Sequence, residues 1–122
     1  MIKLQRVYDY DRDKDGFSIL VDRLWPRGIA KKELDPDEWL KEVAPSTDLR
    51  KWFNHDPDKW EEFKKKYAKE LDHHKDLLEK ILELEKDHNE ITLLYAAKDT
   101  KHTHAKVIKS TLEEMKKKIK TD

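Results

Sequence analysis

The sequence predicts one small α/β domain, spanning residues 1–122, with helices packed on a short and mainly parallel sheet. Three short apolar runs, near residues 2–8, 17–23 and 91–97, have the composition of strands. Apolar residues recur every three or four positions between the second and third runs and again after the third, which is typical of helices with one buried face. A long helical connection between strands allows them to run parallel in one sheet.

The first two strands are indicated by different patterns. Near residues 2–8 apolar and polar residues alternate, which favours a strand close to the edge of the sheet. The second run, near residues 17–23, begins F-S-I-L-V and is almost unbroken. The segment from Asp9 to Gly16 is rich in Asp, but an EF-hand loop starting there would need Gly at its sixth position and Glu at its twelfth. Lys14 and Leu20 stand at those positions, so we interpret the segment as a solvated loop.

Helical patterns fill most of the chain between the second and third strands. Residues 31–36 are a polar linker or a short helical turn, and residues 37–43 fit either a helical turn or a short strand. A short helix is expected to end near Phe53, and Asp56-Pro57 is a strong start signal for the next one. The apolar stripe lapses at residues 72–74, so either two helices or one bent helix follows. The predicted core faces comprise Trp60, Phe63, Tyr67, Leu71, Leu77, Leu78, Ile81, Leu82 and Leu84.

The run near residues 91–97 is the centre of the predicted sheet. Its sequence, I-T-L-L-Y-A-A, contains no charge, which is typical of a strand buried on both faces. A polar loop begins at Lys98, and a helix follows whose inner face is predicted to carry Ile108, Leu112, Met115 and Ile119. In open α/β folds, ligands bind where such a strand passes through a loop into a helix.

Composition and charge exclude several functions. The chain has 27 basic and 27 acidic residues, so its net charge is zero. Nucleic acids and anionic membranes bind proteins with an excess of positive charge, and we therefore do not expect them as main partners. No apolar run approaches the roughly 20 residues that span a bilayer. The N-terminal segment is too short and too charged for a signal peptide, so we expect a cytoplasmic protein. The sequence contains no Cys, which excludes disulfides, thiol catalysis and cysteine metal sites.

Side chains that can bind or catalyse follow two of the predicted strands. If these strands are parallel neighbours, their carboxyl ends lie at the same edge of the sheet. The residues brought together there would be Asp22, Arg23, Trp25 and Arg27 from one loop, and Tyr95, Lys98, Asp99, His102 and His104 from the other. Arginines beside a helix N-terminus favour an anion, because guanidinium groups and free N–H groups both bind oxyanions.

The leading hypothesis is therefore a small anionic ligand, held by Arg23 and Arg27 beside the loop of residues 98–104. Whether the domain is an enzyme stays open, because the sequence has no G-x-S-x-G, P-loop or G-x-G-x-x-G pattern, and no pattern identifies a cofactor. If the domain is catalytic, general acid–base work would fall to His102, His104, Asp22 or Asp99.

The residues of this cluster also have plain structural interpretations. Asp22 and Arg23 can form a salt bridge, Trp25 can cover the sheet edge, and Arg27 can be an exposed charge next to a turn. One of the two His side chains can face solvent while the other is packed or hydrogen-bonded.

The pair His102 and His104 supports a metal site, the hypothesis that we rank third. Both rings can face one side only if the backbone between them is extended, since in a helix they point about 200° apart. A third ligand would have to be His55 or Asp99, and because none is evident we assign no metal ligand. For His55, at the join of two helices, we favour packing in a structural corner near Trp60 over a place in a pocket wall.

The runner-up to the anion hypothesis is an interaction module without catalytic activity. In that case large aromatic side chains would lie exposed on the surface and contact a partner protein. The candidates are Trp25, Trp39 and Trp52.

Several longer motifs give the chain a resemblance to a known family. These are R-V-Y-D at residues 6–9, V-D-R-L-W-P-R-G at 21–28, A-P-S-T-D-L-R-K-W-F at 44–53, H-D-P at 55–57, W-E-E-F at 60–63 and L-L-Y-A-A-K-D at 93–99. With them the chain resembles, over nearly its full length, the YeaO-like family of small uncharacterised bacterial and archaeal proteins. The resemblance implies an α/β fold, and it implies no activity because the family has no established function.

A wider set of relatives looks similar at the central strand and loop but carries Cys at the strand end and again just before the second His. In this chain those positions hold Tyr95 and Thr103, so the thiol chemistry of the wider set does not transfer. What the resemblance carries over is the architecture and the matching Arg and His positions. It adds Arg6 and Arg50 to the candidate ligand-binding residues.

Overall fold

The structure, a computed structural model, describes residues 1–10 and 16–121, with side chains up to residue 118. The predicted solvated loop at residues 9–16 therefore lies largely outside the described residues. The same holds for the side chain of Ile119, which we expected on the inner face of the last helix.

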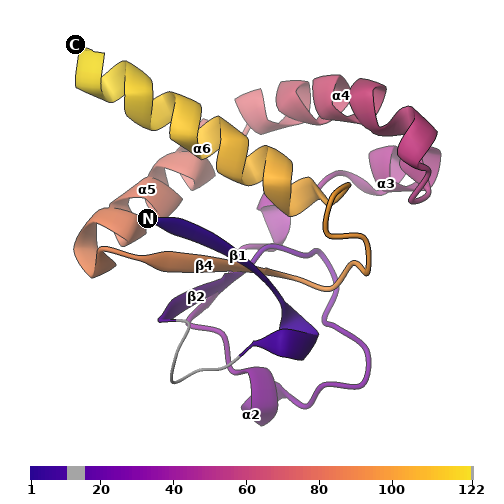
Figure 1. The fold of residues 1–122 in the computed structure, drawn as a ribbon, viewed down its shortest axis with the longest axis horizontal. Helices are drawn as coiled ribbons and strands as arrows, with labels where there is room; N and C mark the ends of the chain where they lie inside the picture. Colours follow the sequence, from indigo (N-terminus) through magenta and orange to yellow (C-terminus); the bar gives the residue numbers. More distant parts are fainter. Residues whose placement is uncertain (11–15, 122) are drawn as a thin grey trace.

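The sheet has four parallel strands in the order β1-β4-β2-β3 (Figure 1). The strands are β1 (Ile2–Arg6), β2 (Phe17–Leu20), β3 (Glu38–Trp39) and β4 (Ile91–Tyr95). The predicted parallel α/β fold is thus confirmed, with β1 at one edge and β4 between β1 and β2. Every residue of β4 is buried, as its uncharged sequence indicates for a strand covered on both faces.

The strands end two or three residues earlier than their apolar runs predict, and the cause at β2 and β4 is a side chain. Val21 still donates its N–H to the carbonyl of Leu94, at 3.1 Å, so the ladder continues to that point. The next donor on β4, the N–H of Ala96, turns to the carboxylate of Asp22 at 2.9 Å. The carboxylate of Asp22 thus replaces a backbone carbonyl as the acceptor. The segments that follow β2 and β4 leave the sheet at this point as loops.

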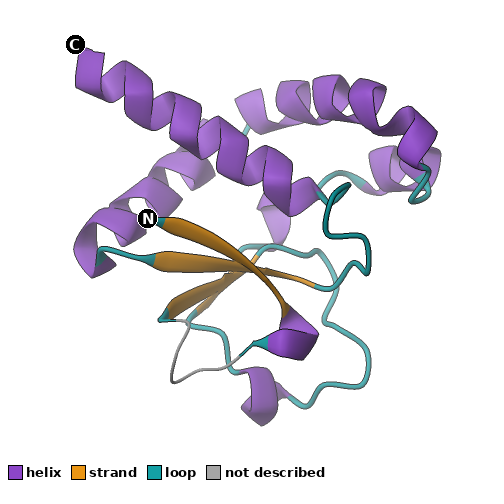
Figure 2. Ribbon diagram, in the orientation of Figure 1, coloured by secondary structure: helices purple, strands orange, loops and turns teal. Residues whose placement is uncertain are grey.

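The rest of the described chain is mainly helical (Figure 2). Its elements are η1 (Val7–Asp9), α2 (Lys31–Leu34), η2 (Lys41–Val43), α3 (Thr47–Phe53), η3 (Pro57–Lys59), α4 (Trp60–Asp72), α5 (Lys75–His88) and α6 (His104–Thr121). The stripe that lapses at residues 72–74 therefore belongs to two helices. The segment at residues 37–43, which fits two structures by its pattern, forms the short strand β3 followed by the helical turn η2.

Apolar side chains gather on both faces of the sheet. On one face Ile19 and Leu93 join the main core, which α4, α5 and α6 cover with Phe63, Tyr67, Leu71, Leu78, Ile81, Ile108 and Leu112. Leu20 and Leu94 point to the other face, where Leu34 of α2 and the indole of Trp25 cover them. This alternation along each strand explains how a four-stranded sheet is buried on both sides by one long helical layer and one short loop layer.

Capping bonds hold α3 at the edge of the sheet. Ser46 caps the helix by accepting the N–H of Leu49 at 3.2 Å, and Asn54 ends it in the left-handed conformation, with φ of 46°. Glu70 of α4 accepts the backbone N–H of Ser46 at 2.8 Å and its hydroxyl at 2.6 Å. These bonds clamp α3 to α4 and so fix the position of Arg50 on α3.

Glu85 of α5 supports a prediction about acid stability. It is 6% exposed and accepts hydrogen bonds from Lys116, at 2.8 Å, and from the amino group of Met1, at 2.7 Å. Burial raises the pKa of Glu85, but these hydrogen bonds outweigh burial and leave its pKa below the ordinary value of 4.5. Because the folded pKa lies below the unfolded one, the stabilisation is complete above pH 4.5 and is lost as pH falls through the folded pKa.

Replacing Glu85 by Gln should therefore lower the free energy of unfolding at neutral pH by about 1–3 kcal/mol. The difference from the wild type should shrink as pH falls below 4.5 and through the lowered pKa of folded Glu85. Urea denaturation at neutral and acidic pH measures both values. Glu83→Gln, at an exposed position of the same helix, should leave stability nearly unchanged. An equal loss in both variants would show that Glu85 has no special role.

Candidate functional site

The carboxyl ends of β2 and β4 open onto one cavity of about 670 Å³. Residues 22–27, which follow β2, form one side of the cavity, and residues 96–99 and 102–104, which lead into α6, form another. Both segments leave the same end of the sheet (Figure 1) because β2 and β4 are parallel neighbours. The remaining lining residues come from the first turn after β1 and from the α3 region and α4, namely Tyr8, Ala44, Pro45, Arg50, Phe53, His55 and Phe63.

Asp22 joins three elements at this cavity. One carboxylate oxygen, Oδ2, accepts the N–H of Ala96 at 2.9 Å. The other, Oδ1, lies 3.2 Å from Nε2 of His104, although it makes no hydrogen bond and its surface is buried. Both side chains are 16% exposed. Asp22 therefore fixes the loop after β2 against the end of β4 and the start of α6.

His104 begins α6 and points back to the end of β2. Its Nε2 lies 3.0 Å from the carbonyl oxygen of Val21. A carbonyl can only accept a hydrogen bond, so Nε2 must carry a proton. That single N–H serves the carbonyl of Val21, which explains why the nearby Oδ1 of Asp22 is left without a hydrogen bond. The ring also contacts the edge of Tyr67, with centroids 6.2 Å apart.

Asp99 and His102 shape the loop before α6. Oδ1 of Asp99 accepts the backbone N–H groups of Lys101, at 2.9 Å, and His102, at 3.0 Å. Oδ2 of Asp99 lies 2.7 Å from Nδ1 of His102. The hydrogen bond with the His102 side chain, followed by that from the Lys101 backbone, lowers the pKa of Asp99. The His102 ring packs edge to face on Trp60 at 5.4 Å, so this loop is held by both polar and aromatic contacts.

Four cationic side chains line the cavity, and they differ in their contacts and exposure. Arg23 donates to the carbonyls of Pro45 and Ala44, at 3.3 and 3.1 Å, and so ties the loop after β2 to the chain before α3. Arg27 and Lys98 are exposed at the rim. Arg50 alone combines a place in the lining with a buried Nε that has no hydrogen-bond partner.

Three further residues predicted for the site have mainly structural roles. Trp25 lines the cavity, donates its indole N–H to the carbonyl of Ile29 at 2.7 Å and packs edge to face on Trp39 at 5.5 Å. Tyr95 is 4% exposed and lies outside the lining, and burial raises its pKa. Arg6, also outside the lining, donates to the carbonyl of Ala97 at 3.0 Å.

Sequence patterns missed most of the apolar wall. Phe53 and Phe63 belong to helical stripes that predict core positions, and both do lie in the core, yet they also line the cavity. Tyr8 and Leu24, at 49% and 66% exposed, form an apolar rim that no pattern marks. His55 lies exposed in the lining, and it is His102 whose ring contacts Trp60.

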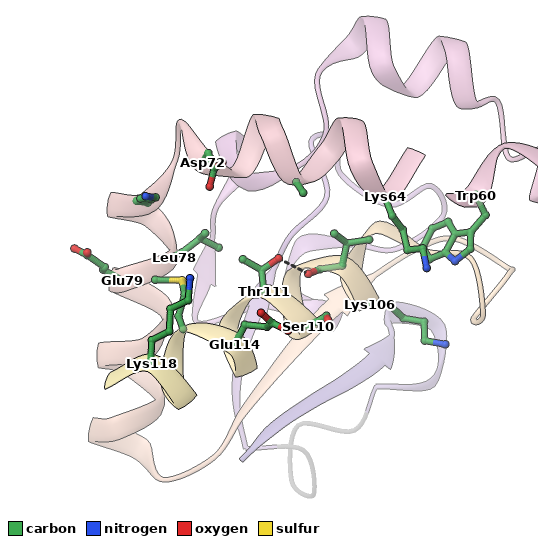
Figure 3. A pocket seen from close by; sticks show the side chains of 14 residues that line it. Trp60, Lys64, Asp72, Leu78, Glu79, Lys106, Ser110, Thr111, Glu114 and Lys118 are labelled. Atoms are coloured by element: carbon green, nitrogen blue, oxygen red, sulfur yellow. Dashed lines mark hydrogen bonds between the residues drawn. The ribbon is translucent and has the colours of Figure 1, made fainter. Parts of the chain in front are cut away.

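A second groove of about 700 Å³ lies between α4, α5 and α6, away from the strand ends (Figure 3). Trp60 and Lys64 border one end, and Glu79 and Lys118 lie at the other. The hydroxyl of Thr111 bonds within its own helix, to the carbonyl of Val107 at 2.8 Å. The lining of this second groove mixes apolar side chains with charges of both signs. We therefore interpret the groove as the junction between three amphipathic helices.

The described residues contain neither a metal-binding cluster nor a membrane-spanning helix. No group of three or more His, Asp or Glu side chains among residues 1–10 and 16–121 is arranged to hold a metal ion. Within the same described part of the chain, no helix has the length and apolar character needed to cross a membrane.

Comparison with known proteins identifies relatives along the whole chain. A family described as the inactive DUF488-N3 subclade matches residues 1–122. The uncharacterized protein YeaO of Escherichia coli is 43% identical over 114 residues, covering 93% of this chain and 98% of its own length. The uncharacterized proteins Mb3100c of Mycobacterium bovis and Rv3073c of Mycobacterium tuberculosis are each 35% identical over 111 residues, covering 91% of this chain and 92% of theirs. No solved structure shows significant similarity.

These matches agree with the motifs that lie around the strand-end cavity. V-D-R-L-W-P-R-G forms the end of β2 and the loop after it, and A-P-S-T-D-L-R-K-W-F forms α3 with the chain before it. The chain belongs to the YeaO-like family, within the inactive DUF488-N3 subclade.

Proposed function

We propose that this protein binds a small organic anion in the strand-end cavity. The observation that carries the proposal is Arg50, a residue of the cavity lining whose Nε is buried and has no hydrogen-bond partner. A buried charged donor left unpaired costs about 1–3 kcal/mol or more. A planar oxyanion in the cavity would accept from the guanidinium fork and remove that cost.

The charges around the cavity support an anion. Arg23, Arg27, Arg50 and Lys98 give four positive charges in the lining, against two carboxylates. One of the carboxylates, Asp99, is engaged by His102 at 2.7 Å. The surplus of positive charge in a partly buried space attracts an anion more strongly than the same charges would in open water.

Binding without catalysis agrees best with the residues at the strand end. The two positions that hold Cys in the wider set of relatives are Tyr95 and Thr103, both almost fully buried. The family to which the chain belongs is described as inactive. We therefore propose that His102 and His104 position the loop before α6, through Asp99 and Val21, and do not transfer protons to a substrate.

The other two hypotheses have weaker support. The indole N–H groups of Trp25 and Trp39 are both satisfied inside the domain, and both rings are half-buried, as is Trp52. This favours structural roles over a docking surface. The ring contacts of His102 and His104 with Asp99 and Val21 likewise explain the His pair without a metal.

Thermal unfolding with added anions tests the proposal. At about ten times its Kd, an anion should stabilise the wild type by about 1.4 kcal/mol and raise Tm by about 5 °C. The probes are acetate, 3-phenylpropionate and inorganic phosphate, each compared with sodium chloride at the same ionic strength. Arg50→Met should abolish the increase, because it removes the guanidinium and retains a similar apolar stem.

Lys51→Met is the matched control for charge. Lys51 is exposed on the same helix, so this variant loses one positive charge without changing the cavity. It should respond to each anion as the wild type does. Equal responses in Arg50→Met and Lys51→Met, or no response beyond that of sodium chloride in the wild type, would contradict the proposed function.

A further inference from the structure

Two residues of the cavity lining each have a buried polar atom that makes no hydrogen bond, one an acceptor and one a donor; the acceptor, Oδ1 of Asp22, lies 3.2 Å from Nε2 of His104. Among the described residues, two buried side-chain nitrogen or oxygen atoms lack a hydrogen-bond partner, Nε of Arg50 and Oδ1 of Asp22. Both residues line the strand-end cavity. Buried polar atoms in proteins are nearly always paired, so the presence of both exceptions in one cavity points to a ligand that pairs with each.

The two atoms require opposite properties of that ligand. Arg50 can only donate, so it needs an anionic oxygen, whereas the carboxylate of Asp22 can only accept, so it needs an N–H or O–H group. The other oxygen of Asp22 is engaged by the N–H of Ala96, and the Nε2–H of His104 serves Val21. Neither the N–H of Ala96 nor the Nε2–H of His104 is therefore free to donate a hydrogen bond to Oδ1 of Asp22.

The walls of the cavity define the rest of the ligand. Phe53 and Phe63 stack with centroids 4.3 Å apart and both line the cavity, together with Trp25 and Pro26. Such walls favour an apolar or aromatic body on the ligand. A compact dianion such as phosphate fits poorly, because it has no apolar part and would face the negative charge of Asp22.

We propose that the ligand is a small carboxylate that also carries a hydrogen-bond donor and an apolar side chain, the chemistry shared by apolar α-amino acids and α-hydroxy acids. This inference rests on the proposed function. The carboxylate pairs with the fork of Arg50, the ammonium or hydroxyl group donates to Oδ1 of Asp22, and the side chain lies against Phe53 and Phe63. Asp22 is then the residue that distinguishes this ligand from a simple carboxylate.

Isothermal titration with four probes tests the inference. The probes are L-phenylalanine, L-phenyllactate, 3-phenylpropionate, which has the same body and no donor, and inorganic phosphate. In the wild type, L-phenylalanine or L-phenyllactate should bind about ten-fold more tightly than 3-phenylpropionate. The reason is that 3-phenylpropionate cannot donate a hydrogen bond to the charged carboxylate of Asp22. The tighter of the two identifies the donor as ammonium or hydroxyl.

Asp22→Asn should abolish that preference while 3-phenylpropionate binds nearly as before. Asp87→Asn, at an exposed position of α5, is the matched control and should keep the preference. Equal binding of all three phenyl compounds to the wild type would overturn this inference and leave the proposed function standing. Tightest binding of inorganic phosphate would overturn both. Failure of every probe to bind would overturn both. Because the comparison among probes is made on the wild type, it does not depend on how well the Asp22 variant folds.

Discussion

Replacing Phe63 by Ala should lower the free energy of unfolding by about 3–5 kcal/mol. Phe63 is 1% exposed and is surrounded by aromatic rings, with centroids 4.3 Å from Phe53, 5.6 Å from Trp60 and 5.5 Å from Tyr67. Truncation removes these contacts and enlarges the adjoining strand-end cavity, which α3 and α4 cannot close because Ser46 and Glu70 clamp them together. Equilibrium denaturation in urea measures the loss.

The matched comparison for Phe63 is Tyr8→Ala, another aromatic truncation at the same cavity. Tyr8 is 49% exposed, so its loss should cost less than about 1 kcal/mol. A cost for Phe63→Ala as small as that for Tyr8→Ala would show that the aromatic cluster is not part of the rigid core.

Replacing Asp22 by Ala should cost about 2–3 kcal/mol and should loosen the end of β4. The variant loses the acceptor for the N–H of Ala96 and the carboxylate beside His104. Amide hydrogen exchange gives the specific test, since the Ala96 N–H should lose protection far more than the amides in the middle of β4. Asp22→Asn, which retains an acceptor oxygen, should keep most of that protection.

The outcome at Ala96 also separates two explanations for Asp22. If the Ala variant were destabilised but Ala96 stayed protected, the effect of Asp22 would lie elsewhere in the domain. The account of how β2 and β4 end would then be wrong.

The fold was largely predictable because its main signals are local. An uncharged run such as I-T-L-L-Y can be buried on both faces only in the middle of a sheet, and it forms β4. Asp56 and Pro57 start a helical segment whatever lies around them, and Asp56 does cap it, accepting the N–H of Asp58 at 3.0 Å. The strand β3 has only two residues, too few for any periodicity to mark it.

The site was predictable only where strand order determines it. Parallel neighbours bring their loops together, which is why Asp22 and His104 meet although they lie far apart in the sequence. The contribution of α3 could not be derived in this way. Its place over the sheet edge depends on tertiary bonds such as that between Ser46 and Glu70, and Arg50 was indicated only through the family resemblance.

The central claim is that the guanidinium of Arg50 receives a small anion, and its own NMR signal tests that claim most directly. The Nε–H resonance of Arg50 is assigned as the signal that disappears in Arg50→Lys, and it is followed while 3-phenylpropionate or L-phenylalanine is titrated into the wild type. We expect this resonance to shift in a saturable manner, because a new hydrogen bond forms at Nε, while sodium chloride at the same ionic strength leaves it in place. A resonance that stays unmoved by both probes would contradict the account.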